Sequence, residues 1–261
     1  MSLPQPLLAF EAEAKTLAAE LARIDAAFAR FRSARDSGHI LPNSVEAIRV
    51  ELTYHSNAIE GSTLSLRETQ LVLEGHAPPG GKSLREIYEA RNHDRALTLI
   101  ESWAQAWPIE RSLTEDDLLQ LHAQVLADID PRSAGRLRTD RVLIKGSRFI
   151  PPGSHTFSTL VPALLERANR PGSHPALQAA ELHYNLVAVH PFADGNGRTA
   201  RLLMNLHLLR QGFPHTIIEV DRRAQYLSAL EDANAGNAEP FARFIADCVD
   251  RSIERLVGND D

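Results

Sequence analysis

The chain has a single cysteine, two methionines and two tryptophans among its 261 residues. Cys248 therefore cannot form an intramolecular disulfide, and its apolar helical neighbours indicate a buried structural residue. No apolar run approaches the roughly 20 residues that span a bilayer. The N-terminus also lacks the basic start of a secretory signal. We expect a cytoplasmic protein without a membrane partner.

A surplus of basic residues is also missing, because the formal net charge is −6 and the pI is near 6.0. Binding to nucleic acid through a broad surface needs clustered Lys and Arg, so no nucleic-acid partner is expected. Hydrophobic residues make up 43% of the chain. At this length they can form a sizeable core, either in one large domain or in a main domain with a smaller appendage.

Apolar residues recur mostly at helical spacing. Leu17, Leu21, Ile24 and Phe28 predict an amphipathic first helix that packs on its own domain, with a homodimer contact as the alternative. Capping boxes predict three further helix starts, at Ser65 with Glu68, Ser83 with Glu86, and Thr114 with Asp117. The remaining helices are expected over about 44–60, 160–168, 175–189, 198–210, 222–233 and 240–256.

A β-rich run interrupts this helical pattern. Residues 141–144 and 148–150, joined by Lys145-Gly146-Ser147 and followed by Pro151-Pro152, predict one small hairpin. Such a ribbon is marginal alone and has to lean on helices. The fold class predicted from the pattern is all-α with one β-hairpin.

The run from His190 to Arg201 combines the residue types that phosphate chemistry needs. Backbone N–H groups of Gly195, Asn196 and Gly197, at the start of a helix, form a nest for an anion. Asp194 beside this nest would repel a bare phosphate, so a bridging divalent cation is expected, most readily Mg²⁺.

Two arginines and a histidine complete the predicted site. Arg198 and Arg201 are three residues apart, project from one helix face and can bind further phosphate oxygens, which suggests a nucleotide. His190 can take a proton from an incoming nucleophile near neutral pH. A histidine at a helix end is ordinarily a cap or a surface residue, but its neighbours here favour a catalytic base.

The pattern His-Pro-Phe-x-Asp-Gly-Asn-Gly-Arg-x-x-Arg resembles the signature of the Fic family, and the resemblance extends over about residues 44–253. It implies a Fic-type helical bundle that transfers AMP from ATP to a hydroxyl of a target protein. His190 would be the base and Asp194 the Mg²⁺ ligand. Gly195, Asn196 and Gly197 would bind the α- and β-phosphates, Arg198 the transferred charge and Arg201 the γ-phosphate.

The same resemblance assigns further residues. Tyr226 and Asn234 resemble residues that line the family's adenine pocket. Gly135 to Arg138, together with the predicted hairpin, resembles the flap that docks an extended target segment carrying a Ser, Thr or Tyr acceptor. The hairpin residues assigned to it are Arg141, Val142, Leu143, Ile144, Arg148, Phe149 and Ile150.

Residues Ser56 to Gly61 resemble the inhibitory Ser/Thr-x-x-x-Glu-Gly/Asn motif of some Fic proteins. Glu60 would then pair with Arg201 and remove the donor that the γ-phosphate needs. Some members use the same glutamate to remove AMP, so a de-AMPylase or bifunctional enzyme stays open. The implied organisation is an N-terminal helical segment (1–43), an inhibitory-helix region (44–113) and a Fic core (114–261).

Three other hypotheses remain at this stage. The transferred group could be another nucleotide or phosphate-containing group. A metal-dependent phosphohydrolase would use His174, His183, His190 and Asp194 as ligands, although their spacing is poor and leaves the Gly-Asn-Gly-Arg run without a role. A non-catalytic nucleotide-binding module would keep the fold as a docking surface.

Overall fold

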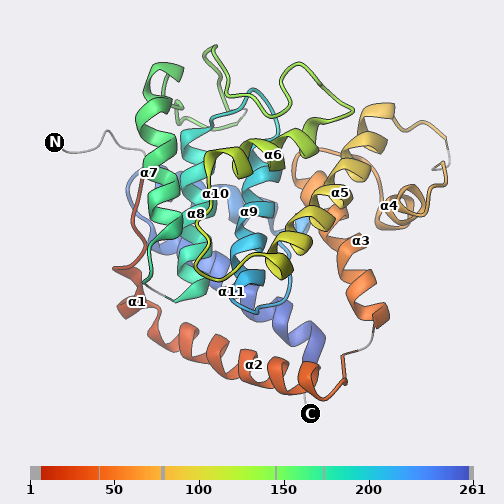
Figure 1. The fold of residues 1–261 in the computed structure, drawn as a ribbon, viewed down its shortest axis with the longest axis vertical. Helices are drawn as coiled ribbons and strands as arrows, with labels where there is room; N and C mark the ends of the chain where they lie inside the picture. Colours follow the sequence, from red (N-terminus) through yellow and green to blue (C-terminus); the bar gives the residue numbers. More distant parts are fainter. Residues whose placement is uncertain (1–6, 41, 78–79, 145, 173, 259–261) are drawn as a thin grey trace.

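The computed structural model describes residues 7–40, 42–77, 80–144, 146–172 and 174–258, and their regular structure is entirely helical (Figure 1). The α-helices are α1 (Glu13–Thr16), α2 (Ala18–Asp36), α3 (Pro42–Ile59), α4 (Leu66–Leu73), α5 (Leu84–Ala106), α6 (Glu115–Leu126), α7 (Phe157–Asn169), α8 (Pro175–Val189), α9 (Asn196–Arg210), α10 (Arg223–Asn234) and α11 (Glu239–Val257). Two 3₁₀ turns are η1 (Ser154–Thr156) and η2 (Val220–Arg222).

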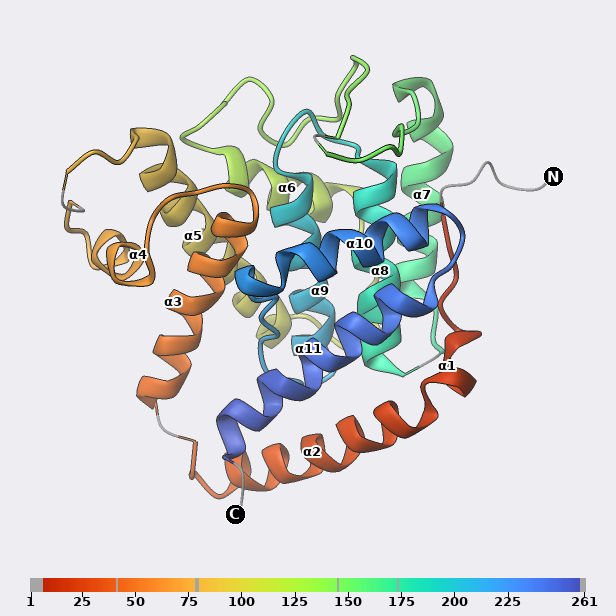
Figure 2. The same ribbon diagram turned by 180° about the vertical axis from the view of Figure 1, so that it is seen from behind.

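Helices α8 and α9 lie at the centre of the bundle, with the other long helices around them (Figures 1 and 2). Most residues of α8 are apolar and buried, as expected for a helix enclosed on all sides. Two hydrophobic clusters meet on this pair of helices, one through Tyr184 and Met204 and the other through Leu186 and Leu202. The rigid centre of the fold therefore carries the loop between α8 and α9.

The N-terminal part of the chain packs on this body. Leu21 and Ile24 on α2 join the same cluster as α8 and α11, so the prediction that the first helix packs on its own domain is confirmed. Ahead of α1, Leu8 N–H donates to Asn185 Oδ1 at 2.9 Å and Phe10 N–H to Glu181 Oε2 at 2.9 Å.

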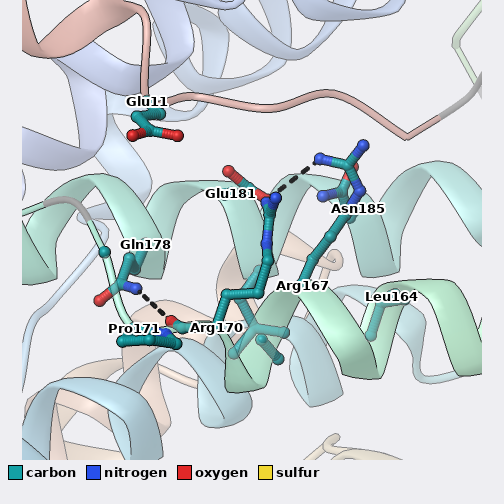
Figure 3. A pocket seen from close by; sticks show the side chains of 11 residues that line it. Glu11, Leu164, Arg167, Arg170, Pro171, Gln178, Glu181 and Asn185 are labelled. Carbon is teal, nitrogen blue, oxygen red and sulfur yellow. Dashed lines mark hydrogen bonds and ion pairs between the residues drawn. The ribbon is translucent and has the colours of Figure 1, made fainter.

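Figure 3 shows the small cavity of about 60 Å³ near these contacts, where Arg167 and Arg170 reach Glu181. Its lining residues include none of the predicted site residues. The cavity therefore belongs to the attachment of the N-terminal segment, because Glu181 and Asn185 both bind that segment's backbone.

The three capping boxes predicted from the sequence are confirmed. Ser65, Ser83 and Thr114 each accept a hydrogen bond from the backbone of the residue three positions on, whose carboxylate returns to the cap. Pro175 occupies the first turn of α8, where a missing N–H costs no hydrogen bond, and Gly212 has a positive φ of 82° after α9, a conformation that favours glycine.

The predicted β-hairpin is wrong, since no strand is assigned among the described residues of 141–150. Ser147 N–H does bond to Ile144 O at 3.1 Å, which makes a turn without a ladder. Ser147 Oγ instead donates to Glu231 on α10, and Phe149 packs against the first hydrophobic cluster. The β-rich composition of 141–144 and 148–150 favoured strands, but these contacts with helices hold the segment as a loop.

We call residues 141–150 the flap loop. In both views it lies at the same end of the bundle as the connection between α8 and α9 (Figures 1 and 2). None of the helices in the described ranges combines the length and apolar character needed to cross a membrane.

Candidate active site

His190 ends helix α8 in a left-handed conformation, with φ 48° and ψ 55°. It is the only residue other than glycine with a positive φ in the described part of the chain. Pro191 explains why the helix stops here, because proline has no N–H for the helix and disfavours helical geometry in the residue before it. The backbone therefore turns sharply at the histidine.

The imidazole of His190 is arranged as a neutral base. Its Nδ1 lies 3.2 Å from the carbonyl of Val187, which can only accept, so Nδ1 carries the proton and Nε2 is left with its lone pair. Burial lowers the pKa of His190 below its usual value, and the charge of Arg138 adds to this effect. The ring is therefore in its neutral form at neutral pH, with its one proton on Nδ1.

The loop after His190 is closed by one buried amide. Asn196 Oδ1 accepts from Phe192 N–H at 3.0 Å, and Asn196 Nδ2 donates to Phe192 O at 2.9 Å. Gly195 has a φ of 77°, and a Cβ there would lie 3.3 Å from Val125 Cγ1. A glycine is needed at this position for both reasons. The side chain of Asn196 holds the loop, which leaves the N–H groups of Asn196 and Gly197 for the predicted anion nest, whereas the N–H of Gly195 donates to Asp194 Oδ1.

His122 on α6 also holds this loop, a contact that the sequence gave no means of predicting. Its ring stacks on Phe192 with centroids 3.6 Å apart. Burial lowers the pKa of His122 to about 4, so the ring is neutral. Its Nδ1 accepts from Gly135 N–H at 3.1 Å while Nε2–H donates to Asp194 O at 2.9 Å.

Asp194 lies at the amino end of α9 between two arginines. Its Oδ2 is 2.5 Å from Arg85 Nη2, and its Oδ1 accepts from Gly195 N–H at 2.6 Å and contacts Arg198 Nη2 at 3.4 Å. Burial would raise the pKa of Asp194, but Arg198, the Gly195 amide and Arg85 outweigh it and lower the pKa. Asp194 is thus an ionised carboxylate, and its side chain is 47% exposed.

One exposed, ionised carboxylate fits a magnesium ion that completes its shell with phosphate oxygens and water. The described residues contain no cluster of three or more His, Cys, Asp or Glu that could hold a metal by themselves. The histidines proposed for a phosphohydrolase are engaged elsewhere. His183 is buried against Tyr226 with its pKa lowered to about 3 by burial, and His174 Nδ1 accepts from Ala176 N–H.

Arg198 and Arg201 follow on the first two turns of α9, and both are buried. Arg198 Nη1 lies 3.2 Å from Glu89 on α5, but neither this nitrogen nor Nε makes a hydrogen bond of acceptable geometry. Arg201 Nη1 is likewise buried without a hydrogen-bond partner. Both guanidinium groups therefore keep donors for an anion at the start of α9.

Arg201 is held by the end of α3, as the sequence interpretation anticipated. Its Nε donates to Ser56 Oγ at 2.9 Å, and its Nη2 donates to Ser56 O at 2.9 Å and Glu60 Oε1 at 2.7 Å. Burial alone would lower the pKa of Arg201, but the nearby Glu60 carboxylate raises it.

Local geometry explains how Glu60 reaches Arg201. After α3, Gly61 N–H bonds to Ala58 O at 3.0 Å and Ser62 N–H to Asn57 O at 3.0 Å. This is the Schellman pattern, and Gly61 takes the positive φ of 103° that the pattern requires. The tight helix end leaves the Glu60 carboxylate 40% exposed above α9.

The two residues assigned to an adenine pocket lie in different surroundings. The ring of Tyr226 is 2% exposed, its hydroxyl lies 3.3 Å from His183 Nε2, and burial raises its pKa to about 12. Asn234, at the end of α10, accepts from Tyr184 Oη at 3.3 Å and is half-buried. Tyr226 is thus enclosed beside His183, while Asn234 is partly accessible.

The flap residues do not form a ladder, but several face outward. Leu143 is 81% exposed and Ile150 is 73% exposed, which is unusual for large apolar side chains. Arg141 and Arg148 are exposed, whereas Val142, Ile144 and Phe149 are half-buried.

Known proteins resemble this chain in sequence. Residues 112–208 match the model of the Fic/DOC family. Over 208 residues the chain is 40% identical to the protein adenylyltransferase fic-1 of Caenorhabditis elegans, covering 78% of this chain and 40% of that protein. The protein adenylyltransferase Fic of Aedes aegypti is 37% identical over 237 residues, covering 89% and 46%. The chain therefore spans less than half the length of these two curated relatives.

Solved structures extend the likeness to the whole bundle. A structure of Fic-1 (residues 134–508) from C. elegans has a TM-score of 0.78 and 32% identity, covering 95% of this chain and 75% of that one. A Fic domain containing signalling protein from Bacteroides thetaiotaomicron has a TM-score of 0.79 and 27% identity, covering 90% and 97%. The chain belongs to the Fic/DOC family.

Proposed function

We propose that this chain transfers AMP from ATP to a hydroxyl group of a protein side chain. The observation that carries the proposal is the free Nε2 of His190, beside a helix start whose arginines keep unused buried donors. A base and an anion site at one place suit attack of a hydroxyl on a phosphate. The relatives named as adenylyltransferases support the choice of AMP.

The reaction assigns one task to each residue. His190 Nε2 takes the proton of the target hydroxyl, whose oxygen bonds to the α-phosphorus of ATP as the bond to the β-phosphate oxygen breaks. Pyrophosphate leaves with the bonding electrons. The N–H groups of Gly195, Asn196 and Gly197 and the Arg198 guanidinium stabilise the phosphate oxygens. Asp194 would hold Mg²⁺, which supplies neutralising charge to the phosphates.

The flap loop is the surface we assign to the target protein. Its exposed Leu143 and Ile150 offer apolar contact at the end of the bundle where α8 connects to α9 (Figures 1 and 2), and His190 ends α8. An extended target segment carrying Ser, Thr or Tyr could bind alongside the loop through main-chain bonds.

We assign Glu60 an inhibitory role. Its carboxylate occupies one donor of Arg201, which the γ-phosphate needs, and places negative charge where phosphate charge has to enter. The ATP-bound, productive state then requires the Glu60 side chain to move away from Arg201.

The test uses two radiolabelled nucleotides with the Glu60→Gly protein and Mg²⁺, and the targets are the protein itself and a cell lysate whose own kinases have been inactivated by heat. Label from α-³²P-ATP should appear on protein, whereas label from γ-³²P-ATP should not, because the γ-phosphate leaves with pyrophosphate. His190→Ala in the same background should abolish transfer while ATP still binds. Transfer of the γ-label, or no transfer under any condition, would contradict the proposal, and the second outcome would favour a binding module.

A further inference from the structure

Arg138 lies where the flap loop meets the turn that carries His190. Its guanidinium donates three hydrogen bonds to backbone carbonyls, from Nε to His190 at 2.8 Å, from Nη1 to Asp140 at 2.7 Å and from Nη2 to Pro152 at 2.7 Å. Its own N–H donates to Pro191 O at 2.9 Å. One side chain therefore joins the catalytic turn to both ends of the segment that contains the flap loop.

The cost of burying Arg138 indicates that these bonds matter. The residue is only 6% exposed, and no carboxylate among the described residues forms an ion pair with it. It lies 4.8 Å from the centre of the Phe157 ring, and burial lowers its pKa. An apolar side chain would fill this space at less electrostatic cost. What an apolar side chain cannot supply is the fork of three directed bonds.

The bond from Arg138 Nε to His190 acts on a strained residue. The left-handed conformation of His190 is unfavourable for a residue with a Cβ, so surrounding contacts have to hold it. Bonds to His190 O and Pro191 O fix two successive carbonyls of this turn. The direction of the imidazole depends on the backbone that these bonds hold.

We propose that Arg138 is the positioning residue of the His190 base. It holds the backbone of His190 in a fixed position relative to the flap loop. A target segment on the loop would thus meet a base attached to the same guanidinium. The proposal rests on the proposed AMP transfer, in which His190 is the base and the flap loop receives the target.

The effect of the Arg138 charge on the pKa of His190 allows an experiment to distinguish a positioning role from simple structural support. Burial lowers the pKa of His190 most, and Arg138 lowers it further, while Glu60 and Asp194 raise it. Removing the positive charge should therefore raise the pKa of His190 and move the acid limb of the rate profile to higher pH. A lysine at position 138 would keep the charge but lose the three-bond fork.

The experiment compares Arg138→Met and Arg138→Lys in the Glu60→Gly background, with Arg132→Met as the matched control. Arg132 is an exposed arginine earlier in the same connection. Both Arg138 variants should lose at least ~10-fold in kcat, as expected for a misplaced base, with KM for ATP within about twofold. The acid limb should move to higher pH in Arg138→Met only, and Arg132→Met should match the parent.

A second readout does not depend on AMP transfer. NMR titration of ¹⁵N-labelled His190 should give a higher pKa in Arg138→Met and an unchanged one in Arg138→Lys. If the parent transfers AMP and both Arg138 variants keep its kcat, positioning by Arg138 is wrong. If the parent transfers no AMP, the proposed function fails. Independently of that result, an unchanged pKa of His190 in Arg138→Met would contradict the action of Arg138 on His190. Should the Met variant not fold, the Lys variant decides through kcat alone.

Discussion

The Glu60 carboxylate lies so close to Gly197 that a Cβ on this glycine would stand 2.2 Å from Glu60 Oε1. Gly197 belongs to the first turn of α9, where backbone N–H groups and the helix dipole favour an anion. The carboxylate thus occupies the neighbourhood in which a phosphate would bind. Under the proposed function, Glu60 and the phosphates of ATP would therefore compete for one location and for Arg201.

Replacing Glu60 by glycine should raise AMP transfer. The change frees Arg201 Nη2 and removes a negative charge beside the anion nest. A coupling of about 1–3 kcal/mol, typical of regulatory contacts, corresponds to roughly 5–150-fold. The rate of α-³²P incorporation into the protein itself or an added target measures this. Glu60→Gln, which keeps the size but loses the charge, should give an intermediate rate, whereas equal labelling in parent and Glu60→Gly would refute inhibition by Glu60.

Replacing Gly197 by alanine should displace Glu60 without activating the protein. Gly197 has helical geometry, so a methyl group costs little in the backbone, and the flexible carboxylate can move away. The same methyl group would obstruct a phosphate at the nest, so ATP binding should weaken by ~10-fold or more, about 1.4 kcal/mol. Calorimetric titration measures the affinity for ATP, and a thermal melt measures whether the methyl group destabilises the fold. Transfer as fast as in Glu60→Gly would mean that phosphate binds elsewhere.

AMP transfer should persist at mildly acidic pH. Burial and Arg138 lower the pKa of His190 below the ordinary 6.5. A depressed histidine pKa keeps the base neutral as the pH falls, so the acid limb of kcat should lie below pH 6.5. Glu60 opposes this shift, so Glu60→Gly should move the limb still lower. The measurement is kcat at saturating ATP from pH 5 to 8, and an acid limb above 6.5 would exclude the buried His190 as the base.

Local signals made much of this fold predictable. Ser65, Ser83 and Thr114 each cap a helix by bonding to the residue three positions on. Both partners therefore lie close together in the sequence, where they can be recognised. The run from His190 to Arg201 was identified for the same reason, because its base, carboxylate, glycines and arginines lie in one continuous stretch of sequence. The pairing of Glu60 with Arg201 spans 141 positions, and only the family resemblance suggested it.

Contacts between distant segments were not predictable. Arg138, His122 and Arg85 reach the catalytic turn from 52 to 109 positions away, and nothing near them in sequence marks those partners. The prediction for the flap loop was wrong for the opposite reason, because a local signal was present and distant contacts outweighed it. The loop's β-rich composition satisfied the local rule for strands, but Ser147 bonds to Glu231 on α10 in place of a ladder.

Removing Arg85 should strengthen metal binding at Asp194. Arg85 Nη2 lies 2.5 Å from Asp194 Oδ2, so a cation at this carboxylate has to displace the arginine. Arg85 is 57% exposed, and such a pair contributes at most about 1 kcal/mol, or roughly fivefold. Electron paramagnetic resonance of Mn²⁺ with a non-hydrolysable ATP analogue gives the affinity. Arg67→Ala, at an exposed arginine on α4, is the control, and weaker Mn²⁺ binding in Arg85→Ala would instead assign Arg85 to the phosphates.

Glu86 should support inhibition from a distance, because it holds the segment that follows Glu60. Its Oε1 accepts from Thr63 N–H at 2.6 Å and from Thr63 Oγ at 2.7 Å. Its Oε2 accepts from Ser83 N–H at 3.0 Å. Burial would raise the pKa of Glu86, but these donors lower it to about 2, so the anchor is lost only as the pH falls towards that value.

Glu86→Ala should therefore raise AMP transfer in the protein that keeps Glu60, by ~2–5-fold for a partly water-screened contact. In the Glu60→Gly background the same substitution should change the rate by less than about twofold, because no inhibitory carboxylate remains to be released. Asp117→Asn, in the corresponding capping box of α6, controls for loss of a cap. Rates from this double-mutant cycle decide the matter, since equal activation in both backgrounds, or in neither, contradicts action through Glu60.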